Sequence, residues 1–282
     1  MSTGFFTDTT LCIGCKACEV ACKQWNELPS DGFEFTGESY DNTTELSATT
    51  WRHVSFSEKV ERKPELPYPQ TRWLMSSDVC KHCTHAGCLE ACPTGAIIRN
   101  EFGNVYIQPD VCNGCGYCVP ACPFGVVDLM QMVGGKDGDP KYNTNVLRAD
   151  RMEHTAVQAI GGIAGKCTLC YDRQRSDLEP ACSKACPTES IQFGDLDELR
   201  ERARKRVEQL QGRQVQARLY GVDENWSVGT LGAFFLLTDA PAEYDLPERP
   251  VLPSTHQPAA YASAAVAATA LFLIGSLIFT RS

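Results

Sequence analysis

Residues 112–123 read CNGCGYCVPACP, the spacing C-x2-C-x2-C-x3-C followed by proline. Three thiolates on so tight a loop can reach three corners of one iron–sulfur cube, and ferredoxin-type chains ligate 4Fe–4S clusters with runs of this kind. Gly114 and Gly116 let the backbone wrap closely and aim amide groups at the sulfurs. The stretch therefore predicts a ferredoxin-type fold built around bound clusters.

All sixteen cysteines of the 282-residue chain fall into four such groups. The groups are Cys12, Cys15, Cys18, Cys22; Cys80, Cys83, Cys88, Cys92; Cys112, Cys115, Cys118, Cys122; and Cys167, Cys170, Cys182, Cys186. The first group has the spacing of the third, the second is C-x2-C-x4-C-x3-C and the last is C-x2-C-x11-C-x3-C. Three groups end in Cys-Pro, and the first departs from this with Lys23. Four complete groups predict four clusters.

Structural zinc and disulfides are the competing interpretations of clustered cysteines. A zinc site often consists of two CxxC pairs and does not need a further cysteine before proline. Residues Met1–Asp8 lack a basic region, a long apolar region and a twin arginine, so we expect no signal peptide and interpret the thiols as metal ligands. His82 and His85 lie within the second group, but four cysteines already complete each site, so we expect both rings behind the ligands or at the surface. A net charge of −9 argues against a nucleic-acid partner.

The fourth cysteine of a ferredoxin-type run ligates the other cluster of a pair. Residues 97–107 separate the second and third groups, and their alternating apolar side chains around a Gly-Asn turn predict a β-hairpin, so these two groups pair. The first and last groups then pair by elimination. The expected ligand sets are cluster A, Cys12, Cys15, Cys18 and Cys186; cluster B, Cys167, Cys170, Cys182 and Cys22; cluster C, Cys80, Cys83, Cys88 and Cys122; and cluster D, Cys112, Cys115, Cys118 and Cys92.

The predicted fold class is α+β, with two interleaved ferredoxin-like modules and a C-terminal transmembrane helix. The expected parts are an outer module over 1–25 and 160–194, a partner-contact insertion over 26–78, an inner module over 79–130, a loop insertion over 131–159, a C-terminal extension with an amphipathic helix over 195–256, and a transmembrane helix over 257–280.

The extension contains a predicted helix over 195–213, with Asp195 as its N-cap and Gly212 at its end. Leucine, alanine and valine side chains share one face of this helix, and arginine and lysine crowd the rest. A solvated basic face is one interpretation, and a docking face for a partner is the other.

The last segment carries no charge from Gln257 to Thr280. At 1.5 Å per residue, residues 259–280 span about 33 Å, enough to cross the hydrocarbon core of a bilayer. Small residues in its first half favour packing against a membrane partner. A core helix of a soluble domain is the alternative. Arg281 follows the span and favours a cytoplasmic C-terminus.

The sequence contains no Gly-rich dinucleotide fingerprint, no nucleophile elbow and no paired-histidine metal motif. We therefore expect no catalytic site and predict that a partner subunit performs the chemistry. Four clusters beside an uncharged C-terminal segment indicate an electron-transfer subunit that works between a soluble partner and a membrane.

The sequence resembles the iron–sulfur β subunits of membrane-bound formate dehydrogenases, within the four-cluster subunits of molybdopterin oxidoreductases. The residues behind this resemblance are CIGCKAC at 12–18 with Trp25-Asn26, Tyr40–Asn42, Leu46–Ala48 with Trp51, Phe56–Glu58, and Glu179–Cys182 before the 195–210 helix. The loop before Cys167 departs from the family by its length.

The resemblance implies a catalytic subunit with molybdenum or tungsten on pyranopterin, and a membrane cytochrome b that passes electrons to quinone. It implies that cluster A faces the catalytic subunit, that cluster D lies nearest the membrane haem, and that the clusters lie on the extracytoplasmic side. Three other functions compete with this one. The first is the same four-cluster electron relay in a hydrogenase or in a sulfur-compound or dimethyl sulfoxide reductase. The others are a membrane-tethered zinc scaffold and a soluble complex that delivers electrons to a nicotinamide-reducing partner.

Overall fold

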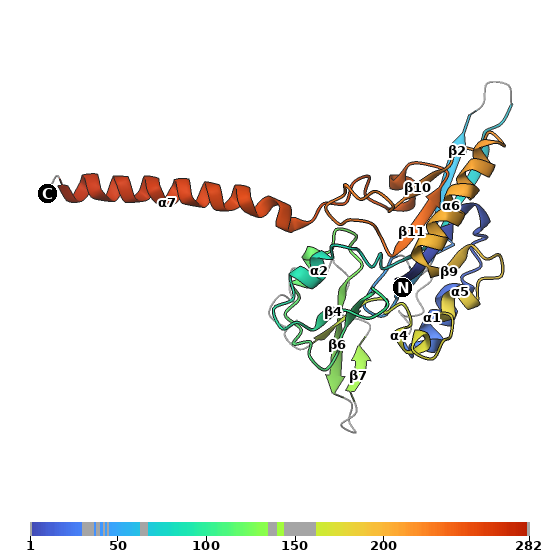
Figure 1. Ribbon diagram of the computed structural model, residues 1–282, viewed down its shortest axis with the longest axis horizontal. Coiled ribbons are helices and arrows are strands. Elements are labelled where there is room, and N and C mark those ends of the chain that lie inside the picture. The colour runs from blue at the N-terminus through green and yellow to red at the C-terminus, as the bar shows by residue number, and fades with distance from the viewer. Residues whose placement is uncertain are drawn as a thin grey trace.

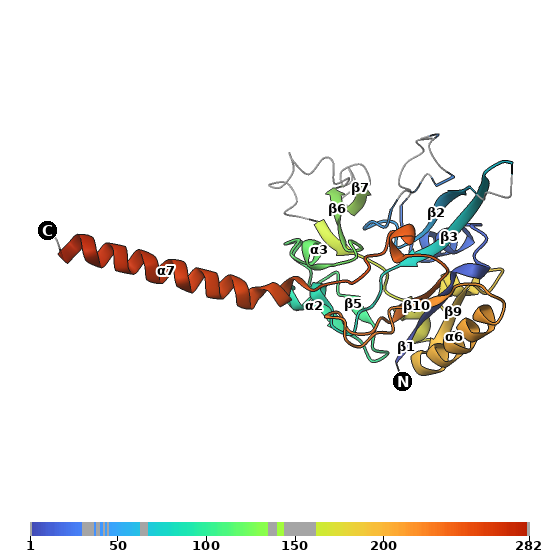
Figure 2. The same ribbon diagram turned by 90° about the horizontal axis from the view of Figure 1, so that it is seen from above.

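The computed structural model describes residues 2–29, 37, 40, 41, 43, 45–62, 67–134, 140–143 and 162–280. The helix α7 (Gln257–Thr280) projects away from the rest of the molecule in both views (Figures 1 and 2). The short helix α2 (Gly87–Glu90) lies at the end of the body from which α7 departs, and α6 (Leu196–Gln211) lies on the far side. The two predicted modules thus follow one another along the long axis.

The central sheet has the strand order β10-β11-β1-β9. Its strands are β1 (Thr3–Asp8), β9 (Ile191–Asp195), β10 (Arg218–Tyr220) and β11 (Ala233–Leu237). β1 runs parallel to β11 and antiparallel to β9, and every residue of β11 is buried. A strand that is covered on both faces has apolar residues at successive positions. The sequence of β11, AFFLL, has this pattern. Segments from both ends of the chain therefore build one sheet.

α6 is the amphipathic helix expected at 195–213, and this prediction is confirmed. The Asp195 carboxylate accepts hydrogen bonds from the backbone N–H groups of Asp197 and Glu198, and Gly212 caps the other end. Leu199, Ala203 and Leu210 form an apolar stripe on this helix. They are buried because they belong to the same hydrophobic core as Phe234 and Leu236 of β11. The helix closes the core of the sheet.

The region 26–78 contains a long hairpin of β2 (Arg52–Glu61) and β3 (Gln70–Val79), which sequence patterns did not reveal. The hairpin reaches outward from the body (Figures 1 and 2). Its buried end begins with Arg52 and His53, two polar residues that obscure the apolar alternation by which strands are recognised. The roots of the hairpin lie against the first group of cysteines.

The predicted hairpin between the second and third groups is confirmed: β4 (Ile97–Arg99) pairs antiparallel with β5 (Val105–Ile107). The third sheet has the order β7-β6-β8. Its strands are β6 (Asp128–Gly134), β7 (Pro140–Asn143) and β8 (Gly162–Gly165). β8 leads directly into the last cysteine group, so this sheet joins the two modules. The expected loop over 131–159 lies largely outside the described residues.

The expected helix at 257–280 is present, but its prediction as a transmembrane span is not supported. Among the helices of the described part of the chain, none is both long enough and apolar enough to cross a bilayer. On this helix Tyr261 and Phe272 are 71% and 75% exposed.

Candidate iron–sulfur sites

The first cavity is lined by Cys12, Cys15, Cys18 and Cys186, together with the loop 13–16. Its first three cysteines come from the turn before α1 (Ala17–Trp25) and the start of that helix, and Cys186 follows α5 (Ala181–Lys184), which packs against α1. The turn is tight because Gly14 and Lys16 both have a left-handed backbone, with φ of 66° and 58°. Two cysteine runs far apart in sequence therefore share one cavity.

A second cavity is lined by Cys80, Cys83, Cys88 and Cys122. Cys80 follows β3, Cys88 lies in α2, and Cys122 follows α3 (Cys118–Ala121). Val105, Phe124 and Val126 give this space apolar walls. These four cysteines again combine three members of one run with the last member of another.

The remaining cysteines also lie near one another. Burial raises the pKa of the Cys118 thiol to about 12, and the thiols of Cys112, Cys115 and Cys92 add to this rise. Burial raises the pKa of Cys22 well above its ordinary value, with Cys167, Cys182 and Cys170 as the thiols that act on it. The structure thus brings together the residues predicted for each of the four sets.

Thiols of one set also raise the pKa of a thiol in a neighbouring set, and these effects connect the four sets in a single sequence. Burial is the largest cause of the raised pKa of Cys18, Cys167 and Cys88, and a thiol of another set adds to each rise. Cys182 acts on Cys18, Cys80 acts on Cys167, and Cys118 acts on Cys88. These three contacts link the first set to the second, the second to the third and the third to the fourth.

Thiols with pKa values this high are protonated in the empty protein. Burial raises the pKa of Cys170 to about 11 and that of Cys88 to about 12. Iron binds the thiolate, so loading each site must displace protons from these residues. The bound state then carries the negative charge of four thiolates.

Buried cations beside the cysteines match such negative groups. Arg52, Lys81 and Lys166 are each 1–2% exposed. The Lys166 ammonium donates to the carbonyls of Val105 (2.5 Å) and Cys167 (3.0 Å), and the Lys81 ammonium bonds Asp78 and the carbonyl of Val79. Within the described part of the chain, Nε and Nη2 of Arg52 are buried and have no hydrogen-bond partner. Burying a cation is costly unless an anion balances it, so these residues fit 4Fe–4S clusters at the cysteines.

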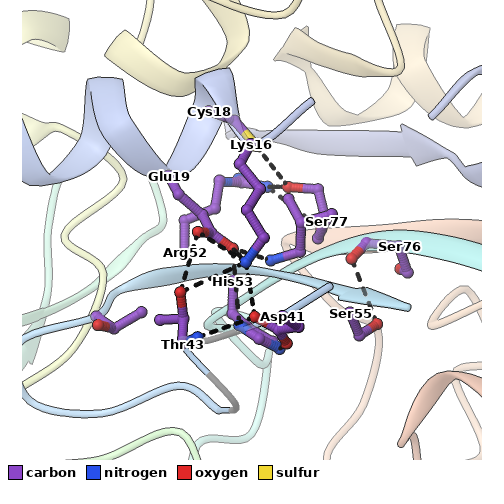
Figure 3. A network of polar contacts seen from close by, with 12 residues as sticks. Lys16, Cys18, Glu19, Asp41, Thr43, Arg52, His53, Ser55, Ser76 and Ser77 are labelled. Atoms are coloured by element: carbon purple, nitrogen blue, oxygen red, sulfur yellow. Dashed lines mark hydrogen bonds and ion pairs between the residues drawn. The ribbon is translucent and has the colours of Figure 1, made fainter. Parts of the chain in front are cut away.

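A polar network anchors the first cysteine loop to the root of the hairpin (Figure 3). The Lys16 ammonium lies 2.6 Å from Asp41 and 3.4 Å from Glu19, and His53 Nε2 lies 2.9 Å from Asp41. Burial would raise the pKa of Asp41, but hydrogen bonds from His53 and Lys16 lower it to about 2. The side chains of Glu19, Asp41 and His53 lie close enough together to surround a cation. The Lys16 ammonium already supplies that charge, so we interpret the cluster as a structural anchor that sequence reasoning missed.

The third cysteine loop packs against β8 through Gly114, and this contact provides a test of the site. A Cβ on Gly114 would lie 2.2 Å from the carbonyl oxygen of Gly162, at a φ of +71°. Gly114→Ala is therefore expected to destabilise the protein by about 3 kcal/mol and to lower its iron content, since overpacking adds to backbone strain.

The matched control is Gly95→Ala. Gly95 has a similar φ of +68° but nothing within 4 Å of its Cβ position. Strain alone predicts a loss of about 1 kcal/mol there, with the iron retained. Thermal unfolding and iron analysis compare the two variants, and equal effects would contradict the packing argument.

Comparison with known proteins identifies iron–sulfur domains in this chain. A family model described as a 4Fe-4S dicluster domain matches residues 71–134 and 151–196, and a second model of the same description matches residues 11–96. The matched segments together contain all four cysteine groups, and the two matches overlap over residues 71–96.

Curated relatives are subunits of oxidoreductases. The formate dehydrogenase-O iron-sulfur subunit of Escherichia coli is 37% identical over 88% of this chain and 72% of its own length. The formate dehydrogenase iron-sulfur subunit of Haemophilus influenzae is 40% identical over 73% of this chain, which spans only 55% of that relative. The B subunit of the anaerobic dimethyl sulfoxide reductase of E. coli is 31% identical over 71% of this chain and 76% of its own length.

The four cysteine runs, the two dicluster-domain matches and the extent of the similarity to curated relatives agree with one another. The part played by such a protein is electron transfer, because its formate dehydrogenase relatives are the iron–sulfur subunits of their complexes and not the catalytic ones. This protein belongs to the family of formate dehydrogenase iron–sulfur subunits, built from 4Fe–4S dicluster domains.

Proposed function

We propose that this protein holds four 4Fe–4S clusters in sets A to D and relays electrons from a formate-oxidising subunit, with molybdenum or tungsten on pyranopterin, to a membrane cytochrome b and quinone. The sets are those expected from the cysteine runs: A, Cys12, Cys15, Cys18, Cys186; B, Cys167, Cys170, Cys182, Cys22; C, Cys80, Cys83, Cys88, Cys122; and D, Cys112, Cys115, Cys118, Cys92. The cavities around sets A and C and the mutual effects of the thiols in sets B and D support these assignments.

The observation that carries the proposal is the order of the sets and the exposure of their cysteines. The pKa effects between neighbouring thiols, which add to the larger effect of burial, run A to B, B to C and C to D. Cys15 of set A and Cys115 of set D are exposed, whereas all four cysteines of set B are buried. A path with two surface ends and a buried middle suits entry of electrons at one partner and exit at another.

Bound 4Fe–4S clusters supply one-electron redox chemistry over a wide range of potentials. The residues of the protein hold the thiolates in place, exclude water with apolar walls such as Val126, and balance charge with Arg52, Lys81 and Lys166. No described side chain needs to move a proton or bind an organic substrate for this task.

The direction of the path rests on the resemblance to the iron–sulfur subunits of formate dehydrogenases. By that resemblance the membrane partner lies at the inner end, near set D, and the catalytic partner at the outer end, near set A. On this arrangement the complex is membrane-associated with its clusters on the extracytoplasmic side.

A second candidate keeps the path and changes the reaction. Identity of 31% to a dimethyl sulfoxide reductase subunit favours the same four-cluster relay running toward a reductase. The two candidates differ in the large subunit that binds near set A.

The test uses the intact complex purified through this subunit. We expect about sixteen irons per copy, cubane-type EPR signals on reduction, and formate-dependent quinone reduction. Zinc in place of iron would overturn the proposal. Full iron with dimethyl sulfoxide reduction and no formate oxidation would select the second candidate.

A further inference from the structure

Arg52 is almost completely buried, with 1% of its surface exposed, and thiols of sets A and B act on its charge. It opens β2, and its Nη1 donates to the carbonyl oxygen (3.3 Å) and to the hydroxyl (3.0 Å) of Ser77 on β3. Figure 3 shows it between the α1 helix that carries Cys18 and the strand that carries Ser77. The start of β2 thus places the charged guanidinium of Arg52 inside the outer module.

The charge of Arg52 has no carboxylate partner within salt-bridge distance among the described residues. Its guanidinium lies 4.8 Å above the ring of Phe5, and its buried Nε and Nη2 find no hydrogen-bond partner among the residues that the structure describes. The titratable groups that act on it most strongly are four thiols, Cys182 and Cys167 of set B, Cys18 of set A and Cys22 of set B. The counter-charge of this cation therefore belongs to both sets.

Ser77 extends this effect to one sulfur. Its hydroxyl accepts from Arg52, and its oxygen lies 3.2 Å from Sγ of Cys18. A Cys18 thiolate bound to iron has no hydrogen to donate, so in the loaded site the Ser77 hydroxyl is the donor to this sulfur. Hydrogen bonds to cluster sulfurs and nearby charge are two of the factors that set reduction potentials.

We propose that Arg52 is the residue that raises the reduction potentials of clusters A and B together, directly by its charge and through Ser77 at Cys18. This inference rests on the proposed function and deepens it. Reduction adds one electron, supplied by the catalytic partner, and hence one negative charge to a cluster, while Arg52 keeps its proton and forms no bond. In a poorly hydrated interior a fixed cation favours the more negative, reduced state.

The two clusters also act on each other. An electron on cluster A repels a second electron on cluster B, and the reverse holds, while the contribution of Arg52 at each cluster is unchanged because potentials add. Two electrons are therefore disfavoured in the outer module at once, which favours their passage one at a time toward sets C and D.

The experiment is a redox titration of the intact complex followed by EPR, with iron analysis of each variant. Arg52→Gln removes the charge, Arg52→Lys keeps it, and Ser77→Ala removes only the link to Cys18. Arg175→Gln is the control, since it removes the same charge from an exposed position near set B.

In Arg52→Gln, two of the four clusters are expected to lose at least tenfold in the ratio of reduced to oxidised form at a fixed potential, which is about 59 mV for one electron. Arg52→Lys and Arg175→Gln should titrate like the wild type, and Ser77→Ala should shift one cluster alone. Unshifted potentials in an iron-replete Arg52→Gln complex would overturn the inference.

Should Arg52→Gln assemble without full iron, Ser77→Ala decides, and wild-type potentials in that variant would overturn the inference as well. A wild-type complex without cubane signals would instead defeat the proposed function. The two failures are therefore distinct.

Discussion

Cys186→Ala is expected to abolish the same EPR signal as Cys15→Ala and to leave the signal that Cys182→Ala removes. In sequence Cys186 belongs to the run of Cys182, but it lines the cavity of Cys12, Cys15 and Cys18. The loss of one ligand from a four-thiolate site should release about four of about sixteen irons. Iron analysis and EPR of the three complexes measure this.

Two of the variants serve as controls for the third. Cys15→Ala removes a ligand of set A and Cys182→Ala removes a ligand of set B, and the question is to which of these two sets Cys186 belongs. Cys22→Ala provides the reciprocal experiment and should behave like Cys182→Ala. If Cys186→Ala and Cys182→Ala lose the same signal, the crossed pairing of runs is wrong, and each run holds its own cluster.

Lys166→Met is expected to lower stability by about 3 kcal/mol, one of the largest effects of any single non-cysteine change. Its buried ammonium satisfies the carbonyls of Val105 in the inner module and Cys167 in the outer one. Methionine fills the space but leaves both carbonyls buried without a donor, and it removes the charge beside Cys80 and Cys88. The temperature at which the complex loses half of its visible cluster absorbance measures the effect.

Lys184→Met is the control, because Lys184 is exposed on α5 in the same outer module. We expect it to change stability by less than about 0.5 kcal/mol. Equal midpoints for the two variants would show that Lys166 does not hold the modules together.

Local signals in the sequence predicted local structure well. The hairpin of β4 and β5 followed from its alternation and turn, and α6 from Asp195 and Gly212, because both depend on neighbours in sequence. The cysteine runs predicted iron–sulfur domains for a similar reason, since spacing on one loop determines which sulfurs converge.

Long-range partners were not predictable in this way. β11 pairs with β1, and no local pattern says which edge an apolar pentapeptide joins. Arg52 begins a strand that reads as polar, and its burial depends on thiols from distant loops. The uncharged segment 257–280 was predicted to be a transmembrane helix. The helix is confirmed but the bilayer span is not supported, because low charge alone does not establish membrane insertion.

The interleaving of the two modules also has a consequence for maturation. The cysteines of the inner module, 80–122, leave the ribosome before Cys167 to Cys186 are made, and β4 and β5 pair locally. The outer module closes only after β9 and β11 have joined the N-terminal strand β1, through pairs such as Phe5 with Phe193 and with Ala233. Contacts this distant form late in folding. On the proposed ligand sets, the cysteines of C and D are therefore complete in the chain before those of A and B, and the N-terminal strand waits unpaired until nearly the whole body has been synthesised.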